Sequence, residues 1–326
     1  MAEQNGQWVT IKGRHVFIAD GESVQDAINK SIARQNEEKK ERDIANAKKQ
    51  AEIANNKSPI SKIEDATRQT LRNAYENHRL RNGLKSVPQK EISDDFFKSY
   101  YGNIDSKVAS VKDSTLKDLS DKYDTALSSV RLMDKTEFLG HKNSFAFTYH
   151  DYTVDTSTLV LNSVKCGDYD KLVGRVGELV QSGYAVKIDS DNYDKYVITH
   201  EFAHTLIDMR TPLNNKTNWL GADYKKIADV RKEIGALYNS YLSELSKLES
   251  QYKSLEMDFI MGTITSEKTK QLSVLSNDIS KLKLSKYSLE NADEFMAEAF
   301  TMSQLGSSDN KYVKSVMNII DKNFRR

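Results

Sequence analysis

Two histidines and a glutamate in the segment HEFAH, residues 200–204, are the strongest candidates for chemistry in this chain. On an α-helix, residues four apart lie on one face, so His200 and His204 can reach one metal ion from adjacent turns. Glu201 can act on a water molecule without being a ligand itself. Bound zinc lowers the pKa of water towards ~7, so a carboxylate can take its proton. Two surface histidines on a helix are the alternative.

A catalytic zinc takes a third protein ligand, and the longer pattern HExxHxxGxxH does not supply one here. Ile207 and Arg210 stand at the Gly and His positions of that pattern. Asp208 lies one turn beyond His204 and would compete for the same face of the helix, which makes it a poor candidate.

The better candidates lie far downstream, in the segment NADEFMAEAF at residues 291–300. Glu294 and Glu298 are four apart on a helix that is otherwise apolar. Carboxylates rarely enter an apolar face unless something pairs with them, so this pair indicates a buried site. Solvation at the helix surface is the alternative, above all for Glu298.

Together, HEFAH and EFMAEAF resemble the catalytic domain of anthrax lethal factor and its relatives, a gluzincin family of zinc metallopeptidases. The resemblance covers roughly residues 140–326. It implies that Glu294 is the third zinc ligand and that Glu298 supports the site from behind the ligands. It also implies that Tyr287, seven residues before the ligand, stabilises the tetrahedral intermediate.

The elements expected to position these residues include long helices, because only three prolines and fourteen glycines occur in 326 residues. Spacings of three and four predict a core-facing helix through Leu116, Leu119, Tyr123, Leu127 and Val130. Two neighbouring strands are predicted around residues 145–149 and 159–161, with the segment TLVLNS as the edge strand that pairs with a peptide substrate. Helices follow at 169–181 and around HEFAH.

A coiled-coil helical hairpin is predicted at about 224–284, with a break at 261–265. Apolar residues recur at gaps of three and four on both sides of this break. Because the hairpin separates His204 from Glu294, we interpret it as an insertion in the metallopeptidase domain at 91–326. Two ordinary packed helices are the alternative.

The N-terminal 90 residues are expected to form an appendage. Residues 1–32 predict a short β-hairpin with a turn at Lys12 and Gly13, followed by the start of a helix at Ser23. Residues 33–90 predict a polar helical appendage or tether, with a new helix from Pro59 to about Leu80. The opening segment WVTIKGRHVFIADGESVQDAI resembles segments of minor head or virion-associated proteins of bacteriophages.

Composition limits the remaining possibilities. Lys and Arg (48) balance Asp and Glu (47), which argues against a nucleic-acid binder. The single cysteine, Cys166, cannot form an intramolecular disulfide and is expected to be a buried thiol. His141 and His150 are expected at the surface. The N-terminus lacks the pattern of a signal peptide and no apolar run could span a membrane, so synthesis in a cytoplasm is expected.

The sequence thus predicts a helix-rich α+β protein with a zincin-like domain and a bound Zn²⁺. The expected function is hydrolysis of a protein or peptide substrate by a zinc-activated water, with Glu201 as general base. Two alternatives stay open. One is a phage virion component that contacts other virion proteins, and the other is a toxin protease delivered into a host cell.

Overall fold

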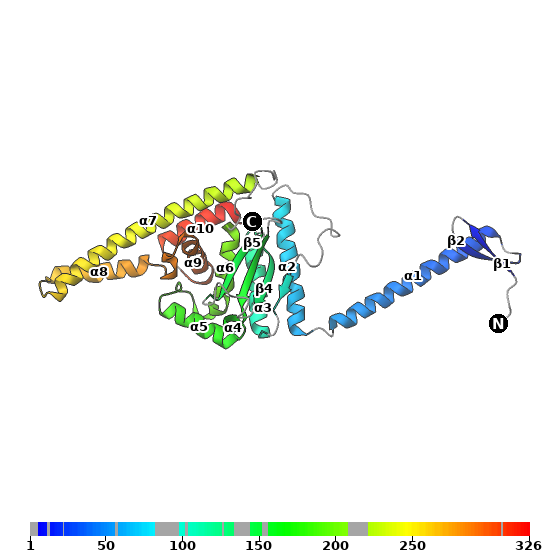
Figure 1. Cartoon of the computed structure of the whole chain (residues 1–326), viewed down its shortest axis with the longest axis horizontal. Coiled ribbons are helices and arrows are strands. Elements are labelled where there is room, and N and C mark those ends of the chain that lie inside the picture. The colour runs from blue at the N-terminus through cyan, green and yellow to red at the C-terminus, as the bar shows by residue number, and fades with distance from the viewer. Residues whose placement is uncertain are drawn as a thin grey trace. The chain divides into compact units, whose positions relative to one another are not determined.

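The computed structural model describes residues 6–11, 14–21, 23–55, 58–81, 98–101, 104–125, 127–133, 144–151, 156–207, 221–307 and 309–326. The chain divides into two compact units, Met1–Ser58 and Pro59–Arg326 (Figure 1). None of the described helices combines the length and the apolar character that a membrane crossing requires.

The first unit contains a β-hairpin followed by one long helix. Strands β1 (Gly6–Ile11) and β2 (Arg14–Ala19) pair antiparallel, as predicted, and the predicted turn residues Lys12 and Gly13 lie outside the described residues. Helix α1 (Val24–Asn55) begins after Ser23, whose hydroxyl accepts a hydrogen bond from the backbone N–H of Asp26. The polar segment from residue 33 to 55 is therefore part of one continuous helix.

The second unit is built on a mixed four-stranded sheet. Its strands are β3 (Lys98–Tyr100), β4 (Leu127–Met133), β5 (Ala146–Asp151) and β6 (Thr156–Asn162), in the order β3-β4-β6-β5. Strand β4 runs parallel to β3 and β6, whereas β5 runs antiparallel to β6. The two predicted strands do pair, but the prediction that TLVLNS forms the edge strand is wrong. That segment belongs to β6, which has a partner on each side, and the edge strands among the described residues are β3 and β5.

Helix α2 (Pro59–Arg81) begins at the predicted proline but belongs to the second unit. It contacts α3 (Ser106–Lys122), β3 and β4. Leu71 is fully buried in the main core, and Thr67 donates a hydrogen bond of 2.9 Å to Asp113 of α3. The prediction of a single appendage over 33–90 is therefore wrong from Pro59 to Arg81. The predicted end of this helix, Asn82 and Gly83, lies outside the described residues.

The helix predicted through Leu116 and Val130 ends earlier than expected. Helix α3 stops at Lys122, and Tyr123 is extended, with φ −125° and ψ 146°. Leu127 and Val130 lie in β4, and neither is exposed. A sheet covered on both faces imposes no alternation of apolar and polar residues, so spacings of three and four could mimic a helix.

The second unit contains seven further helices and two 3-10 turns among its described residues. They are α4 (Ser163–Cys166), α5 (Tyr169–Gln181), the 3-10 turn η1 (Ser190–Lys195), α6 (Tyr196–Ile207), α7 (Gly221–Ile260), α8 (Ser266–Leu282), the 3-10 turn η2 (Tyr287–Leu289), α9 (Ala292–Leu305) and α10 (Lys311–Phe324). Helix α6 contacts β5, β6, α3 and α9. The whole unit is helix-rich, with one small sheet, in agreement with the α+β expectation.

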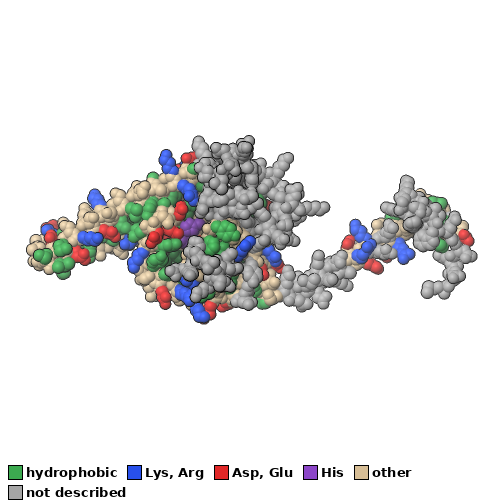
Figure 2. Space-filling view, viewed as in Figure 1, with side chains coloured by type: hydrophobic (Ala, Val, Ile, Leu, Met, Phe, Trp, Pro, Cys, Tyr) green, Lys and Arg blue, Asp and Glu red, His purple; other side chains and the backbone are tan. Residues whose placement is uncertain are grey.

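Helices α7 and α8 run side by side as the predicted hairpin (Figure 1). The hairpin is not an independent insertion over 224–284, because the first half of α7 lies in the main core. Ile227, Ile234 and Tyr241 are at most 2% exposed. At the far end, by contrast, Phe259 and Ile260 are 57% and 70% exposed, and apolar side chains gather there in Figure 2. Only the distal part of the hairpin leaves the core.

Candidate metal centre

Helix α6 holds His200, Glu201 and His204 on a rigid, buried support. All of its residues except His204 are buried, so the helix is fixed by packing on every side. The rings of His200 and His204 lie edge to face, with their centroids 5.1 Å apart. The four-residue spacing thus puts both imidazoles on one face of the helix, as the sequence predicts.

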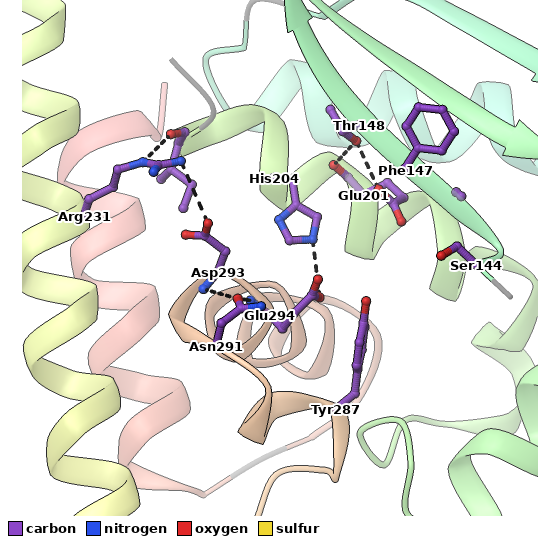
Figure 3. Close-up of a pocket in the computed structure, with 12 residues that line it drawn as sticks. Ser144, Phe147, Thr148, Glu201, His204, Arg231, Tyr287, Asn291, Asp293 and Glu294 are labelled. Carbon is purple, nitrogen blue, oxygen red and sulfur yellow. Dashed lines mark hydrogen bonds and ion pairs between the residues drawn. The ribbon is translucent and has the colours of Figure 1, made fainter. Parts of the chain in front are cut away.

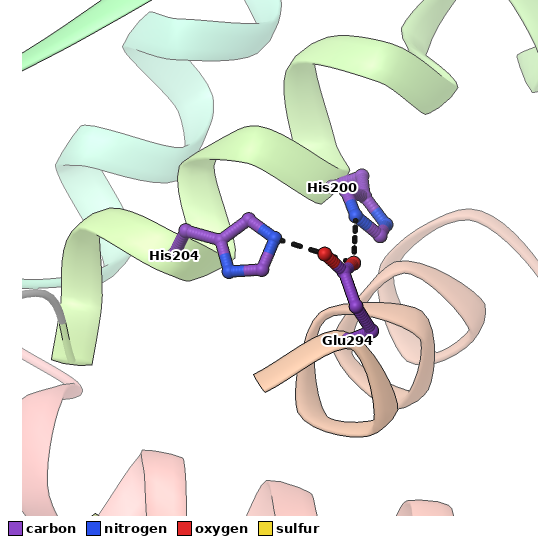
Figure 4. A group of neighbouring side chains, drawn as sticks. All are labelled: His200, His204 and Glu294. Atoms are coloured by element: carbon purple, nitrogen blue, oxygen red, sulfur yellow. Dashed lines mark hydrogen bonds and ion pairs between the residues drawn. The ribbon is translucent and has the colours of Figure 1, made fainter. Parts of the chain in front are cut away.

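Helix α9 brings Glu294 to the two histidines from 94 residues away in the sequence. The side chain of Asn291 caps this helix by accepting hydrogen bonds of 2.9 Å from the backbone N–H groups of Asp293 and Glu294. Because the cap starts the helix there, Glu294 lies in its first turn. One oxygen of Glu294 is 3.0 Å from Nε2 of His200 and 3.5 Å from Nε2 of His204 (Figure 4).

The three side chains meet the requirements of a metal centre. One ligand atom from each lies within 4.8 Å of the other two. A tetrahedral zinc ion with ligand atoms at about 2.1 Å needs them about 3.4 Å apart. The distances of 3.0 and 3.5 Å from Glu294 to the two imidazole nitrogens lie close to that value. Two imidazole nitrogens and a carboxylate oxygen are a donor set that zinc accepts, and a fourth position remains for water or substrate.

Glu298 contacts the nitrogen of the His200 ring that does not face Glu294. Its carboxylate is not exposed and lies 3.0 Å from Nδ1 of His200. It also accepts hydrogen bonds from the hydroxyl of Tyr196 and from the backbone N–H of Val186. A hydrogen atom on Nδ1 of His200 leaves Nε2 free to face Glu294. The supporting role that the resemblance implies for Glu298 stays a prediction.

Without an ion, the cluster holds a proton. Burial alone lowers the pKa of His200, but hydrogen bonds with Glu294 and Glu298 outweigh it and raise this pKa to about 10. Burial would raise the pKa of Glu294, yet hydrogen bonds from His200 and His204 hold it well below its usual range. The carboxylate is thus ionised and the histidine protonated, and a metal ion would replace that proton.

The carboxylate of Glu201 lies beside strand β5. The hydroxyl of Thr148, on β5, donates a hydrogen bond of 3.1 Å to its carboxylate. Glu201 is 8% exposed and lines the cavity in front of the cluster, where it can meet a water molecule (Figure 3). The sequence interpretation missed Thr148, which occurs as one polar residue in the strand segment FAFTYH.

Tyr287 lies in the turn η2, just before α9, and reaches the same cavity. Its ring stacks on His200, with centroids 5.6 Å apart, and on Tyr184, at 5.4 Å. Burial raises the pKa of Tyr287, and the negative charge of Glu294 raises it further. The hydroxyl therefore keeps its proton and can donate it in a hydrogen bond. Nothing in the sequence near Tyr184 indicates its place in this stack.

Two cavities meet at Glu201 and Tyr287. The first, of about 250 Å³, is also lined by His204, Glu294 and Arg231 (Figure 3). The second, of about 400 Å³, is lined largely by apolar or aromatic side chains, including Leu179 and Val197 of α5 and α6. The site therefore has an open, polar side and a second, more apolar side.

Arg231 of α7 connects the ends of the two helices that carry the cluster. Its Nε donates a hydrogen bond of 3.0 Å to the carbonyl of Ile207, the last residue of α6. Its guanidinium is 4.0 Å from the carboxylate of Asp293 in the first turn of α9. The sequence predicted α7 only as one helix of a hairpin, so the contacts of Arg231 with α6 and α9 were not predicted.

Cys166, another candidate from the sequence, is not part of the cluster. Cys166 is buried and its thiol donates to the carbonyl of Phe145, as expected of a buried thiol, and burial raises its pKa. His141 and Asp208 lie outside the described residues, and so does the side chain of His150.

No family model, no curated protein and no solved structure matches this chain. The functional argument therefore depends on the geometry of the site.

Proposed function

We propose that this protein is a zinc-dependent endopeptidase. His200, His204 and Glu294 would hold the ion through two imidazole nitrogens and one carboxylate oxygen. When bound, zinc supplies a Lewis acid that makes water nucleophilic near neutral pH and polarises a carbonyl group. The observation that carries the proposal is the convergence of these three ligands with Glu201 and Tyr287 around one cavity.

Glu201 is the proposed general base. Its carboxylate takes a proton from the attacking water and passes it to the leaving amine. The hydrogen bond from Thr148, which lines the same cavity, fixes the position of this carboxylate. General-base catalysis depends on such positioning, because the acceptor must lie within hydrogen-bond reach of the proton.

Tyr287 is the proposed donor to the oxyanion. Its phenol remains protonated because burial and the charge of Glu294 raise its pKa. As negative charge develops on the carbonyl oxygen, the hydroxyl donates a hydrogen bond to it. The hydroxyl can do so because Tyr287 lines the same cavity as Glu201.

Strand β5 is the proposed place where an extended peptide binds. It is one of the two edge strands of the described sheet, and it contributes Ala146, Phe147 and Thr148 to the cavity beside Glu201. A peptide that adds a strand there would gain backbone hydrogen bonds and pass in front of the cluster. This role replaces the one that the sequence interpretation gave to TLVLNS.

A role in virion assembly is the second candidate. The N-terminal unit and the distal part of the hairpin favour it, because no described residue of either one belongs to the cluster or lines the cavity in front of it. The assembled set of ligands, base and oxyanion donor favours an enzyme, since an assembly module needs none of them. A toxin protease would share the chemistry and differ in delivery.

The test is cleavage of a random peptide library by the full chain loaded with zinc, compared with Glu201→Gln. The wild type should cleave peptides, and the variant should bind zinc as well yet lose turnover, because an amide cannot accept the proton. Glu178→Gln, on α5 outside the cavity lining, is a matched control. Equal turnover in wild type and Glu201→Gln would remove Glu201 as the base, and no cleavage by the wild type would contradict the proposal.

A further inference from the structure

The short segment that carries Tyr287, residues 284–289, is tied to helix α7 by tyrosine hydroxyl groups. Tyr238 donates a hydrogen bond of 2.7 Å to the carbonyl of Leu289. The hydroxyl of Tyr241 accepts from the backbone N–H of Leu284 at 3.2 Å and lies 3.3 Å from the hydroxyl of Ser288. Helix α7 therefore contacts the segment at both of its ends.

The same segment is tied elsewhere to the loop after α5. The backbone N–H groups of Lys286 and Tyr287 donate to the carbonyls of Gly183 and Tyr184, at 2.8 and 3.0 Å. Gly183 has φ +68°, a conformation that glycine adopts without strain. The backbone on which Tyr287 stands is thus fixed at its middle by this loop and at its ends by α7.

The two tyrosines of α7 are themselves fixed to α9. Tyr241 is fully buried and stacks on Phe295, the neighbour of Glu294, with ring centroids 4.9 Å apart. Tyr238 also contacts Phe295, at 5.6 Å. One helix therefore sets the position of the Tyr287 segment relative to the helix that carries the acidic ligand.

We propose that Tyr238 is a positioning residue of the peptidase, whose hydroxyl fixes the Leu289 carbonyl and thereby the place of the Tyr287 phenol beside the cluster. The inference rests on the proposed function, because it assigns Tyr238 to the positioning of the oxyanion donor. Tyr241 shares the task but is part of the core. Tyr238 is half-buried, and its hydroxyl makes one hydrogen bond within the described residues, so the hydroxyl can be removed without leaving a large cavity.

The test variant is Tyr238→Phe in the full chain, studied both with zinc bound and after the metal has been removed. We expect kcat to fall about tenfold with KM within about twofold, because a donor displaced by a fraction of an ångström acts mainly in the transition state. Zinc content should not change. In the metal-free protein, the amides of residues 284–290 should exchange with deuterium about tenfold faster, because the segment opens more often.

Tyr252→Phe is the matched control, since Tyr252 lies on the same helix and its hydroxyl makes no hydrogen bond within the described residues. It should leave both kcat and the amide exchange of residues 284–290 unchanged. Unchanged kcat and exchange in Tyr238→Phe would overturn the inference. So would a uniform rise in exchange over α7 and α9, which would indicate a structural role alone. If the wild type cleaves no peptide, the proposed function fails, and local exchange still decides whether Tyr238 holds the segment.

Discussion

At the scale of single residues, Glu298 explains why His200 presents Nε2 to the cluster. The carboxylate accepts hydrogen bonds from Tyr196, from His200 and from the backbone of Val186, and none of its surface is exposed. A carboxylate that orients a ligand histidine also raises the basicity of that ligand. The residue behind the cluster is therefore expected to affect metal affinity without touching the metal.

Glu298→Gln should weaken zinc binding about 10–100-fold. The amide keeps the size of the carboxylate but offers one acceptor oxygen to three donors, so His200 loses part of its orientation. Competition with a zinc chelator measures the change, and the exposed Glu290→Gln is the control. Equal affinities in wild type and Glu298→Gln would remove Glu298 from the support of the cluster.

Tyr287→Phe should lower kcat ~10²–10³-fold, the usual effect of removing one oxyanion donor. Zinc content and melting temperature should stay close to those of the wild type, because the ring keeps its stacking on His200 and Tyr184. Steady-state kinetics on any cleaved peptide checks the rate. If Tyr287→Phe had the kcat of the wild type, Tyr287 would serve only in packing against His200 and Tyr184.

Much of the cluster could be predicted from sequence because its residue types are unusual where they occur. Two histidines at helical spacing indicate a shared metal ion, and carboxylates on an apolar helix indicate buried groups that pair with them. Thr148, Arg231 and Tyr238 could not be predicted in the same way. Threonine, arginine and tyrosine are common in strands and on helices, and only the tertiary structure places these three beside Glu201, Ile207 and Leu289.

At the scale of elements, α7 serves the site with its first half and leaves the core with its second half. Periodicity predicted both helices of the hairpin and the break between them, because spacings of three and four recur throughout. The same periodicity could not show where along α7 the apolar face stops packing on α9 and α10 and packs on α8 instead. The strand β4 was missed for a related reason, since Leu127 and Val130 are buried on a sheet that is covered on both faces.

Deleting residues 252–274 and joining the ends with a short flexible linker should leave the unit folded and able to bind zinc. The removed part includes the exposed side chains of Met257, Phe259, Ile260 and Met261. Tyr241→Ala, in the first half of α7, should instead lower the free energy of unfolding by about 3–5 kcal/mol, because it empties a filled core position. Denaturant unfolding compares the two. Loss of cooperative unfolding in the deletion variant would show that the distal hairpin also belongs to the core.

At the scale of the whole molecule, the described residues of the cluster and of both cavities all belong to the unit Pro59–Arg326. The unit Met1–Ser58 forms a β-hairpin and a long polar helix. The predicted boundary at residue 90 failed because the polar composition of 59–81 conceals one buried stripe, which includes Leu71 and Ala74. The resemblance of the opening segment to phage virion proteins stays a prediction.

The central claim is that α6 and α9 together hold one zinc ion through His200, His204 and Glu294. Elemental analysis of the purified chain tests it most directly. The wild type should contain about one zinc per chain, Glu294→Ala should contain far less, and the exposed control Glu290→Ala should match the wild type. A wild type without affinity for zinc, or Glu294→Ala with undiminished zinc, would contradict the account.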